Sequence, residues 1–212
     1  YLAARFIASG WSIKRLHREI LLSATWRQSS FASTSSKRID PDNRLLSHMS
    51  RRRLDFEQWR DAMLVASGVL ESGIGGRSTT LDAKGNRRRT LYGTVHRRDM
   101  SPTLLVHDFP DPTQHSPKRG LTVTTLQGLY VLNGPLLEEQ SFALSVRLLT
   151  DESDDLRRIE HVHWLLYGRG PSEREAKLAT QFLGNTNAET PRDRWQQYVH
   201  VLLASNEFMF ID

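Results

Sequence analysis

Four prolines fall between residues 97 and 122, and this density limits most strongly what the chain can fold into. Proline fixes one backbone angle and lacks an amide hydrogen, so such a stretch cannot be a long helix or an inner strand. The prolines therefore predict an irregular loop. On both sides of it, apolar residues recur at the spacing of α-helices.

The region before the loop has the pattern of several helices. Residues 1–9 predict the end of a helix that Gly10 closes, and Ser12 is placed to cap the next one. The Ser- and Pro-containing residues 29–42 predict a loop. A further helix is expected near 53–69. Its expected buried stripe is Phe56, Trp59, Met63, Ala66 and Leu70, and its expected outer face is Arg53, Glu57, Arg60 and Asp61.

The region after the loop predicts helices whose caps can be read directly. Ser172 and Glu175 have the spacing of a capping box, and Thr124 is placed to cap an earlier helix. Pro135 occupies a first-turn position. The expected helices cover residues 125–132, 136–149, 154–167, 172–183 and 192–205.

Between the two helical regions, residues 71–122 are expected to form an insert. Residues 91–96 alternate enough to predict a short strand, paired with 79–83. The expected fold class is therefore mostly α, an irregular multi-helix domain with a small β-hairpin and a long proline-rich loop insert.

A length of 212 residues is that of one medium domain. We expect a single domain over 1–212, helical in 1–70 and 123–208, that forms the C-terminal part of a longer protein. The reason is that Tyr1 stands inside a helical pattern. No apolar run reaches about 18 residues, so no transmembrane segment is expected.

The chain has no cysteine, which excludes thiolate catalysis, disulfides and covalent haem c attachment within it. We therefore expect no cofactor in this chain. Twenty-nine Lys and Arg against 24 Asp and Glu give a net charge of +5, which favours anionic partners. Nucleic acid is not expected as a partner, because no DNA- or RNA-binding motif accompanies the arginine clusters.

Asp108 and Asp111 are the candidate catalytic residues, although no reaction is indicated. Two carboxyl groups with separated pKa values in one pocket could perform general acid and base catalysis. The alternative is structural: the carboxylates cap turns and pair with nearby arginines to hold the loop. The sequence favours this structural role.

Three histidines of the insert, His96, His107 and His115, could contribute to a metal site with the neighbouring carboxylates. Their spacing matches no metal-binding signature, so surface or hydrogen-bonding roles are favoured and no metal is predicted.

The candidate ligand-binding residues share polar or aromatic side chains in or beside the insert. Arginine forks and stacking rings suit an anionic polysaccharide. For the two amide side chains, hydrogen bonding to the loop's own backbone is the favoured alternative. The candidates are Tyr92, Arg97, Arg98, Arg119, Gln127 and Asn133.

Four stretches together resemble one known family. They are GWSIKRLHREILLSATWRQSS at 10–30, DNRLLSHMSRRRLDFEQWRDAML at 42–64, the pattern that opens with HDFPDP and closes with LN over 107–133, and LLASNEFMFID at 202–212. The family is the planctomycete-specific C-terminal domain PSD-one, Domain of Unknown Function 1553. Two positions depart from its pattern: His115 lies where many members have a cysteine-containing turn, and Thr125 where a proline is usual.

The resemblance implies a periplasmic or secreted location and no established activity. Members of the family lie in large multidomain proteins beside a cytochrome-c-type domain. The implied partners are other domains of the same polypeptide, among them one that carries haem c.

Two functions from different classes follow. The favoured one is a non-catalytic packing or ligand-binding module beside haem c or glycan-acting domains. The alternative is a polysaccharide-directed enzyme that uses Asp108 or Asp111 with Arg97 and Arg119. An enzyme should bring these side chains together in a deep pocket, whereas a packing module should tie them in ion pairs.

Overall fold

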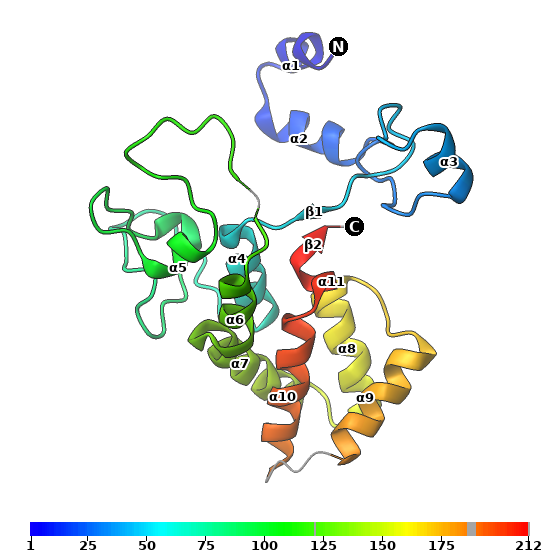
Figure 1. Cartoon of the computed structure of the whole chain (residues 1–212), viewed down its shortest axis with the longest axis vertical. Helices are drawn as coiled ribbons and strands as arrows, with labels where there is room; N and C mark the ends of the chain where they lie inside the picture. Colours follow the sequence, from blue (N-terminus) through cyan, green and yellow to red (C-terminus); the bar gives the residue numbers. More distant parts are fainter. Residues whose placement is uncertain (121, 186–189, 212) are drawn as a thin grey trace. The chain divides into compact units, whose positions relative to one another are not determined.

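The computed structural model describes residues 1–120, 122–185 and 190–211 and is mostly α-helical, which confirms the predicted fold class (Figure 1). Among the helices of these residues, none combines the length and the apolar character needed to cross a bilayer.

The chain forms two compact units. Unit 1 comprises residues 1–52 and 210–212, and unit 2 comprises residues 53–209. Two short strands, β1 (Arg52–Arg53) and β2 (Phe210–Ile211), pair in a two-stranded sheet. The expectation of one domain over the whole chain stays a prediction.

Unit 1 contains three short helices, α1 (Leu2–Ala8), α2 (Ile13–Leu21) and α3 (Thr34–Ile39), and none of them contains a buried residue. The predicted cap of α2 is confirmed, because the Ser12 side chain accepts a hydrogen bond from the Arg15 amide at 3.3 Å. Helix α3 lies where a loop was predicted. Ser33 starts this helix by accepting a hydrogen bond from the Ser36 amide at 3.1 Å.

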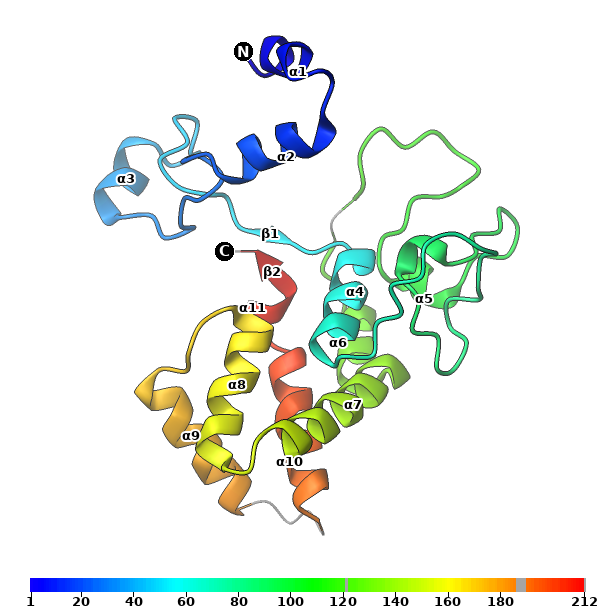
Figure 2. The ribbon, with the colours of Figure 1, turned by 180° about the vertical axis from the view of Figure 1, so that it is seen from behind.

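Unit 2 is built on helices close to the predicted ranges. Helix α7 packs along α10, and α8 and α9 lie beside them (Figures 1 and 2). The predicted caps Thr124 and Ser172 both accept hydrogen bonds from the third residue of their helices. The helices are α4 (Phe56–Ala66), α6 (Thr125–Asn133), α7 (Pro135–Asp151), α8 (Asp155–Tyr167), α9 (Glu173–Asn185), α10 (Pro191–Leu203) and α11 (Asn206–Met209).

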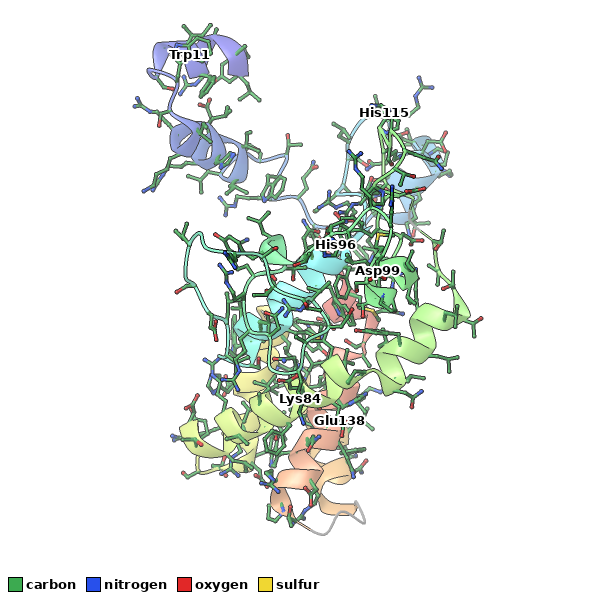
Figure 3. The ribbon with its side chains drawn as sticks, turned by 90° about the vertical axis from the view of Figure 1, so that its left-hand side faces the viewer. Trp11, Lys84, His96, Asp99, His115 and Glu138 are labelled. Atoms are coloured by element: carbon green, nitrogen blue, oxygen red, sulfur yellow. The ribbon has the colours of Figure 1, made fainter. Side chains whose placement is uncertain are left out.

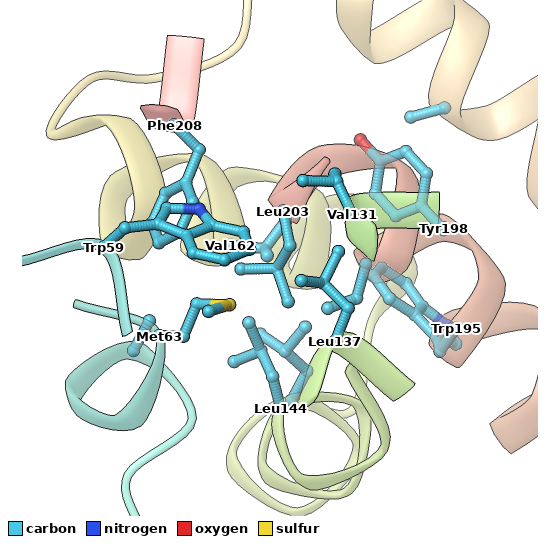
Figure 4. Close-up of a cluster of buried hydrophobic side chains, with 14 of the residues drawn as sticks. Trp59, Met63, Val131, Leu137, Leu144, Val162, Trp195, Tyr198, Leu203 and Phe208 are labelled. Carbon is cyan, nitrogen blue, oxygen red and sulfur yellow. The ribbon is translucent and has the colours of Figure 1, made fainter. Parts of the chain in front are cut away.

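The hydrophobic core of unit 2 lies between α4, α7, α8 and α10 (Figure 4). Each helix contributes side chains that are almost completely buried, among them Met63, Leu144, Val162 and Leu203. This core fixes α4 and α6, the two helices against which the insert lies.

Helix α4 begins three residues later than predicted, because Asp55 and Gln58 form a capping box at its start. Phe56, Trp59, Met63 and Ala66 of the predicted stripe are buried, whereas Leu70 lies beyond the end of the helix and is half-buried. Arg60 is not on a solvent face and is only 2% exposed. The insert covers this side of α4, and the Arg60 guanidinium donates hydrogen bonds to the carbonyl oxygens of Asn86 and Arg88.

The insert contains less strand and more helix than predicted. Instead of a strand over 91–96, a 3₁₀ turn, η1 (Thr90–Tyr92), is followed by a single bridge between Thr79 and Gly93. A second bridge joins Glu71 and Arg88. The proline-rich stretch forms a short helix, α5 (Pro102–Val106), because proline is well suited to a first helical position.

Candidate functional site

Asp108 is the centre of a polar cluster that closes the proline-rich loop. Its backbone is left-handed, with φ of +57°, a conformation that Asp adopts more readily than most residues. Its carboxylate accepts hydrogen bonds from the Thr122 amide at 2.9 Å and from the Thr122 hydroxyl at 2.7 Å. These two bonds hold the two ends of the loop together.

The environment of Asp108 favours its ionised form. Burial raises the pKa of the carboxyl group, but the hydrogen bonds from Thr122 and Gln127 outweigh this effect and lower the pKa below its usual value. A carboxylate that stays ionised near neutral pH can accept hydrogen bonds from its neighbours. It is poorly matched to general acid catalysis.

Gln127 joins this cluster to the start of α6 and is only 2% exposed. Its amide nitrogen donates hydrogen bonds to the Val106 carbonyl and to Asp108, both at 3.0 Å. Its oxygen accepts a hydrogen bond of 2.7 Å from Arg53. Gln127 is also the third residue of the capping box that Thr124 begins. All of these bonds are internal to unit 2, in agreement with the backbone-binding alternative for this residue.

Arg119 fastens the loop to α4 through a bidentate ion pair with Glu57, with N–O distances of 2.7 and 2.5 Å. The guanidinium also lies over the Phe109 ring, 5.0 Å from its centroid. Burial raises the pKa of Glu57, but the hydrogen bonds from Arg119 help to lower it overall. Both terminal nitrogens of the guanidinium donate to Glu57, so the groups with which Arg119 would bind a ligand are already in use.

Asp111 has a local role. Its exposed carboxylate accepts hydrogen bonds from the Thr113 amide at 2.8 Å, the Thr113 hydroxyl at 2.7 Å and the Gln114 side chain at 3.2 Å. The bonds from Thr113 lower the pKa of Asp111. This arrangement is a turn stabilised by its own acidic residue.

His107 is separated from the other two histidines of the insert. Its ring packs among those of Phe56, Trp59 and Tyr130, with centroid distances of 4.8, 5.7 and 4.7 Å. Burial lowers the pKa of His107, so the imidazole is neutral.

His96 and His115 are exposed and lie well apart (Figure 3). In the described parts of the chain, no three His, Cys, Asp or Glu side chains are grouped so that they could hold a metal ion. The three histidines of the insert therefore do not form a shared site.

The remaining predicted residues are dispersed over the insert and α6. The Tyr92 hydroxyl accepts a hydrogen bond from the Gly75 amide at 2.9 Å, and Arg88 covers its ring at 4.1 Å. Asn133 donates a hydrogen bond to the Leu129 carbonyl within α6. By contrast, Arg97 and Arg98 are exposed.

Hollows of very different size adjoin the insert, and one of about 460 Å³ is lined by Glu57, Asp61 and Arg119. Asp108, Arg119, Gln127 and His107 line a cavity of about 30 Å³. A groove of about 860 Å³ lies between the insert and α7, with Lys84 and Glu138 on its wall (Figure 3). None of the predicted catalytic or ligand-binding residues lines this groove. The candidate residues that come together thus surround the small cavity.

Several residues of this site were missed because their partners are distant in sequence. Arg53 and Glu57 were assigned to the outer face of a helix, and Trp59 to the core. In the structure these three line the small cavity or hold the loop beside it. A charged residue one helical turn from a buried aromatic residue is only a weak sign that it contacts a loop. The sequence does not indicate which distant residue it pairs with.

Replacing Asp108 with asparagine should lower the free energy of unfolding by about 1–2 kcal/mol, because an amide nitrogen would face the donors of Thr122 or Gln127. The Asp111→Asn variant is the matched control and should unfold like the wild type. Urea denaturation measures both.

The effect of Asp108 should also depend on pH in one direction. Because folding lowers its pKa, its contribution is present above the pKa of the unfolded chain, about 3.9, and is lost as the pH falls through the lower folded value. A difference between wild type and Asp108→Asn that persists unchanged at lower pH would contradict this role.

The fold and the site define a class: a helical domain with a long irregular insert that polar anchors hold on its helices. A family model described as PSD1, Protein of unknown function (DUF1553), matches residues 1–183, and the chain belongs to this family. A search of curated proteins found no match, and neither did a search of solved structures.

Proposed function

We propose that this chain is a non-catalytic packing module of a larger protein, in which unit 1 carries the surface that receives a neighbouring domain. The observation that carries the proposal is the absence of buried residues in α1, α2 and α3. Large apolar side chains are left open there, including Trp11 at 65%, Trp26 at 52% and Phe31 at 83% exposure. Exposed apolar surface of this kind marks interaction sites.

The charge of unit 1 indicates the chemistry of its partner. Residues 1–52 contain ten Lys and Arg against three Asp and Glu. One of the three acids, Glu19, already pairs with Arg5 at 2.5 Å. On α2, Ile13, Leu16 and Ile20 share one side and basic residues occupy the other. A partner with an apolar patch surrounded by acidic residues is complementary to this helix.

The size of the small cavity supports a non-catalytic role over the enzyme alternative. Sites for small molecules usually measure about 300–1,000 Å³. The cavity beside Asp108 and Arg119 measures about 30 Å³ and cannot admit a sugar ring. A larger hollow of about 460 Å³ beside Arg119 is lined by none of the other proposed catalytic residues Asp108, Asp111 and Arg97. Asp108 and Arg119 instead hold the insert in place.

The location of the module and its neighbouring domains belong to the same proposal and rest on the family resemblance. The module would lie in a secreted or periplasmic planctomycete protein, with other domains of the same polypeptide, including a haem c domain, as neighbours. Binding of an anionic polysaccharide is the rival for the same basic surface, with Arg97 and Arg98 as further cations on unit 2.

Hydrogen exchange distinguishes a packed surface from an open one. The amides of α2 should exchange more slowly in the full polypeptide than in this chain alone. In the full polypeptide, Ile13→Glu should abolish that protection, whereas Lys14→Glu, on the polar side of α2, should leave most of it. Equal exchange rates of α2 in the two wild-type proteins would rule the packing role out.

The polysaccharide rival predicts a different result. Chondroitin sulfate added to this chain alone would protect α2, and the protection would decrease with added salt. Lys14→Glu would then weaken protection more than Ile13→Glu. Observation of that order would replace the packing role with polysaccharide binding.

A further inference from the structure

The large groove between the insert and α7 has the size of a ligand site. It measures about 860 Å³, within the range of about 300–1,000 Å³ that such sites usually have. Its apolar lining includes Leu81, Leu136 and Phe142, and the Phe142 side chain is 42% exposed. All residues of the groove belong to unit 2, so a ligand held here is independent of the packing role of unit 1.

Three polar side chains of the groove have no partner among the described residues. Lys84 comes from the insert, Glu138 from α7 and Gln196 from α10, and their side chains make no hydrogen bond or ion pair there. Other polar groups of the lining are already engaged. Asp82 accepts hydrogen bonds from two hydroxyl groups, and the Arg60 guanidinium binds carbonyl oxygens. The groove therefore offers an ammonium group, a carboxylate and a carboxamide to a ligand.

The charges of the groove have both signs. Lys84 and Glu138 lie on different walls, the insert and α7 (Figure 3). The lining as a whole has an excess of acid, with Lys84 and Arg60 against Asp82, Glu138 and Glu139. A polyanion would be repelled by this excess, although the whole chain has a net charge of +5. A molecule with an ammonium group at one end and a carboxylate at the other is complementary to both walls.

We propose that this groove binds a short peptide with free ends, its ammonium group at Glu138 and its carboxylate at Lys84. Because these two side chains form no ion pair with each other, the charges of the ligand have to be separated. A tripeptide separates its ends by up to about 10 Å, and its central side chain would lie on the apolar lining. The Gln196 side chain has both a donor and an acceptor, which suits a peptide group.

The test titrates this chain with the tripeptide Ala-Leu-Ala and follows the backbone amide signals by NMR. The peptide with free ends should shift the signals of residues 81–86 and 136–142 along one saturation curve. If these signals did not shift at any concentration up to the solubility of the peptide, or if the shifts lay elsewhere, the site would be refuted.

Blocking the ends of the peptide tests whether its charges are recognised. N-acetylation removes the ammonium group, and C-terminal amidation removes the carboxylate. Each change should weaken binding about three- to fivefold at low ionic strength, the effect of one exposed ion pair. A peptide with both ends blocked that bound as tightly as the free one would show that the groove takes a segment of a longer polypeptide. That result would overturn the proposal of a free peptide.

Two variants test which wall holds which end. Glu138→Gln should weaken binding as N-acetylation does, and acetylation should have no further effect on this variant. Lys84→Met should have the same relation to amidation. The matched controls, Glu160→Gln on α8 and Lys177→Met on α9, replace exposed residues outside the groove and should bind like the wild type. Equal losses in the variants and their controls would mean that net charge alone matters, which contradicts the site.

Discussion

The Arg60→Ala variant is expected to lose about 3 kcal/mol of unfolding free energy, because several buried acceptors lose their donor at once. The guanidinium is 2.9 Å from the Arg88 carbonyl oxygen, 2.6 Å from that of Asn86 and 3.1 Å from the Thr90 hydroxyl. Burial lowers the pKa of Arg60. Alanine would leave these oxygens covered by protein and without a partner. Urea denaturation measures the loss.

Two further variants separate hydrogen bonding from charge and packing. Arg60→Met keeps the length of the side chain without its donors, so it should be nearly as unstable as Arg60→Ala. Arg89→Ala removes a neighbouring arginine whose side chain is 58% exposed and whose ion pair with Asp61 spans 3.3 Å. It should change stability by no more than about 0.5 kcal/mol. If Arg60→Ala behaved like Arg89→Ala, Arg60 would not anchor the insert.

The helices of unit 2 could be predicted because their signals are local. The capping boxes at Thr124 and Ser172 each lie within four residues, and both form as expected. The apolar stripe of α4 was also correct, since Phe56, Trp59 and Met63 are buried. A period of 3.6 residues is sufficient to place such residues on one face.

The outer face of α4 could not be predicted because its partners are backbone atoms distant in sequence. Arg60 is bound by carbonyl oxygens 26 and 28 residues away, and a carbonyl has no residue-specific signature. Glu57 pairs with Arg119 across 62 residues. Charged residues on an amphipathic helix are usually solvated, and the pattern gives no sign that an insert covers them.

Because sequence spacing does not show which distant residues meet, only some of the predicted residues of the candidate site come together in the structure. Asp108, Arg119 and Gln127 come together, because the chain returns from the loop to α6 beside α4. Asp111 remains in its own turn. Proximity in sequence suggested that the two carboxylates act together, but Asp111 bonds to Thr113 and Gln114 within its own turn, whereas Asp108 bonds to Thr122 and Gln127.

Gln127→Glu should be as disruptive as the loss of Arg60, although the two side chains have the same shape. The oxygen that accepts from Arg53 is kept. In place of the amide nitrogen, a second oxygen would lie 3.0 Å from both the Val106 carbonyl oxygen and the Asp108 carboxylate. Two lost donations and a like-charge contact should together cost about 3 kcal/mol at neutral pH.

The pH dependence of the stability of Gln127→Glu tests whether the like-charge contact with Asp108 causes the loss of stability. Repulsion by Asp108 should raise the folded pKa of the new carboxyl group above its unfolded value of about 4.3. Below the unfolded pKa the new carboxyl group is fully protonated, and the stability of the protonated form is fully present. This stability is lost as the pH rises through the folded pKa and the group ionises. The stability gap to wild type should therefore narrow as the pH falls from 7 to 5.

The matched control is Gln58→Glu, at the same position of the capping box that begins α4. The Gln58 side chain is exposed and accepts a hydrogen bond from the Asp55 amide at 3.2 Å. A glutamate there keeps the acceptor and places negative charge at a helix N-terminus, which is mildly favourable. Urea denaturation at pH 7, 6 and 5 should show a gap only for Gln127→Glu. A gap of the same size at all three values would mean that lost donation, and not repulsion by Asp108, is the cause.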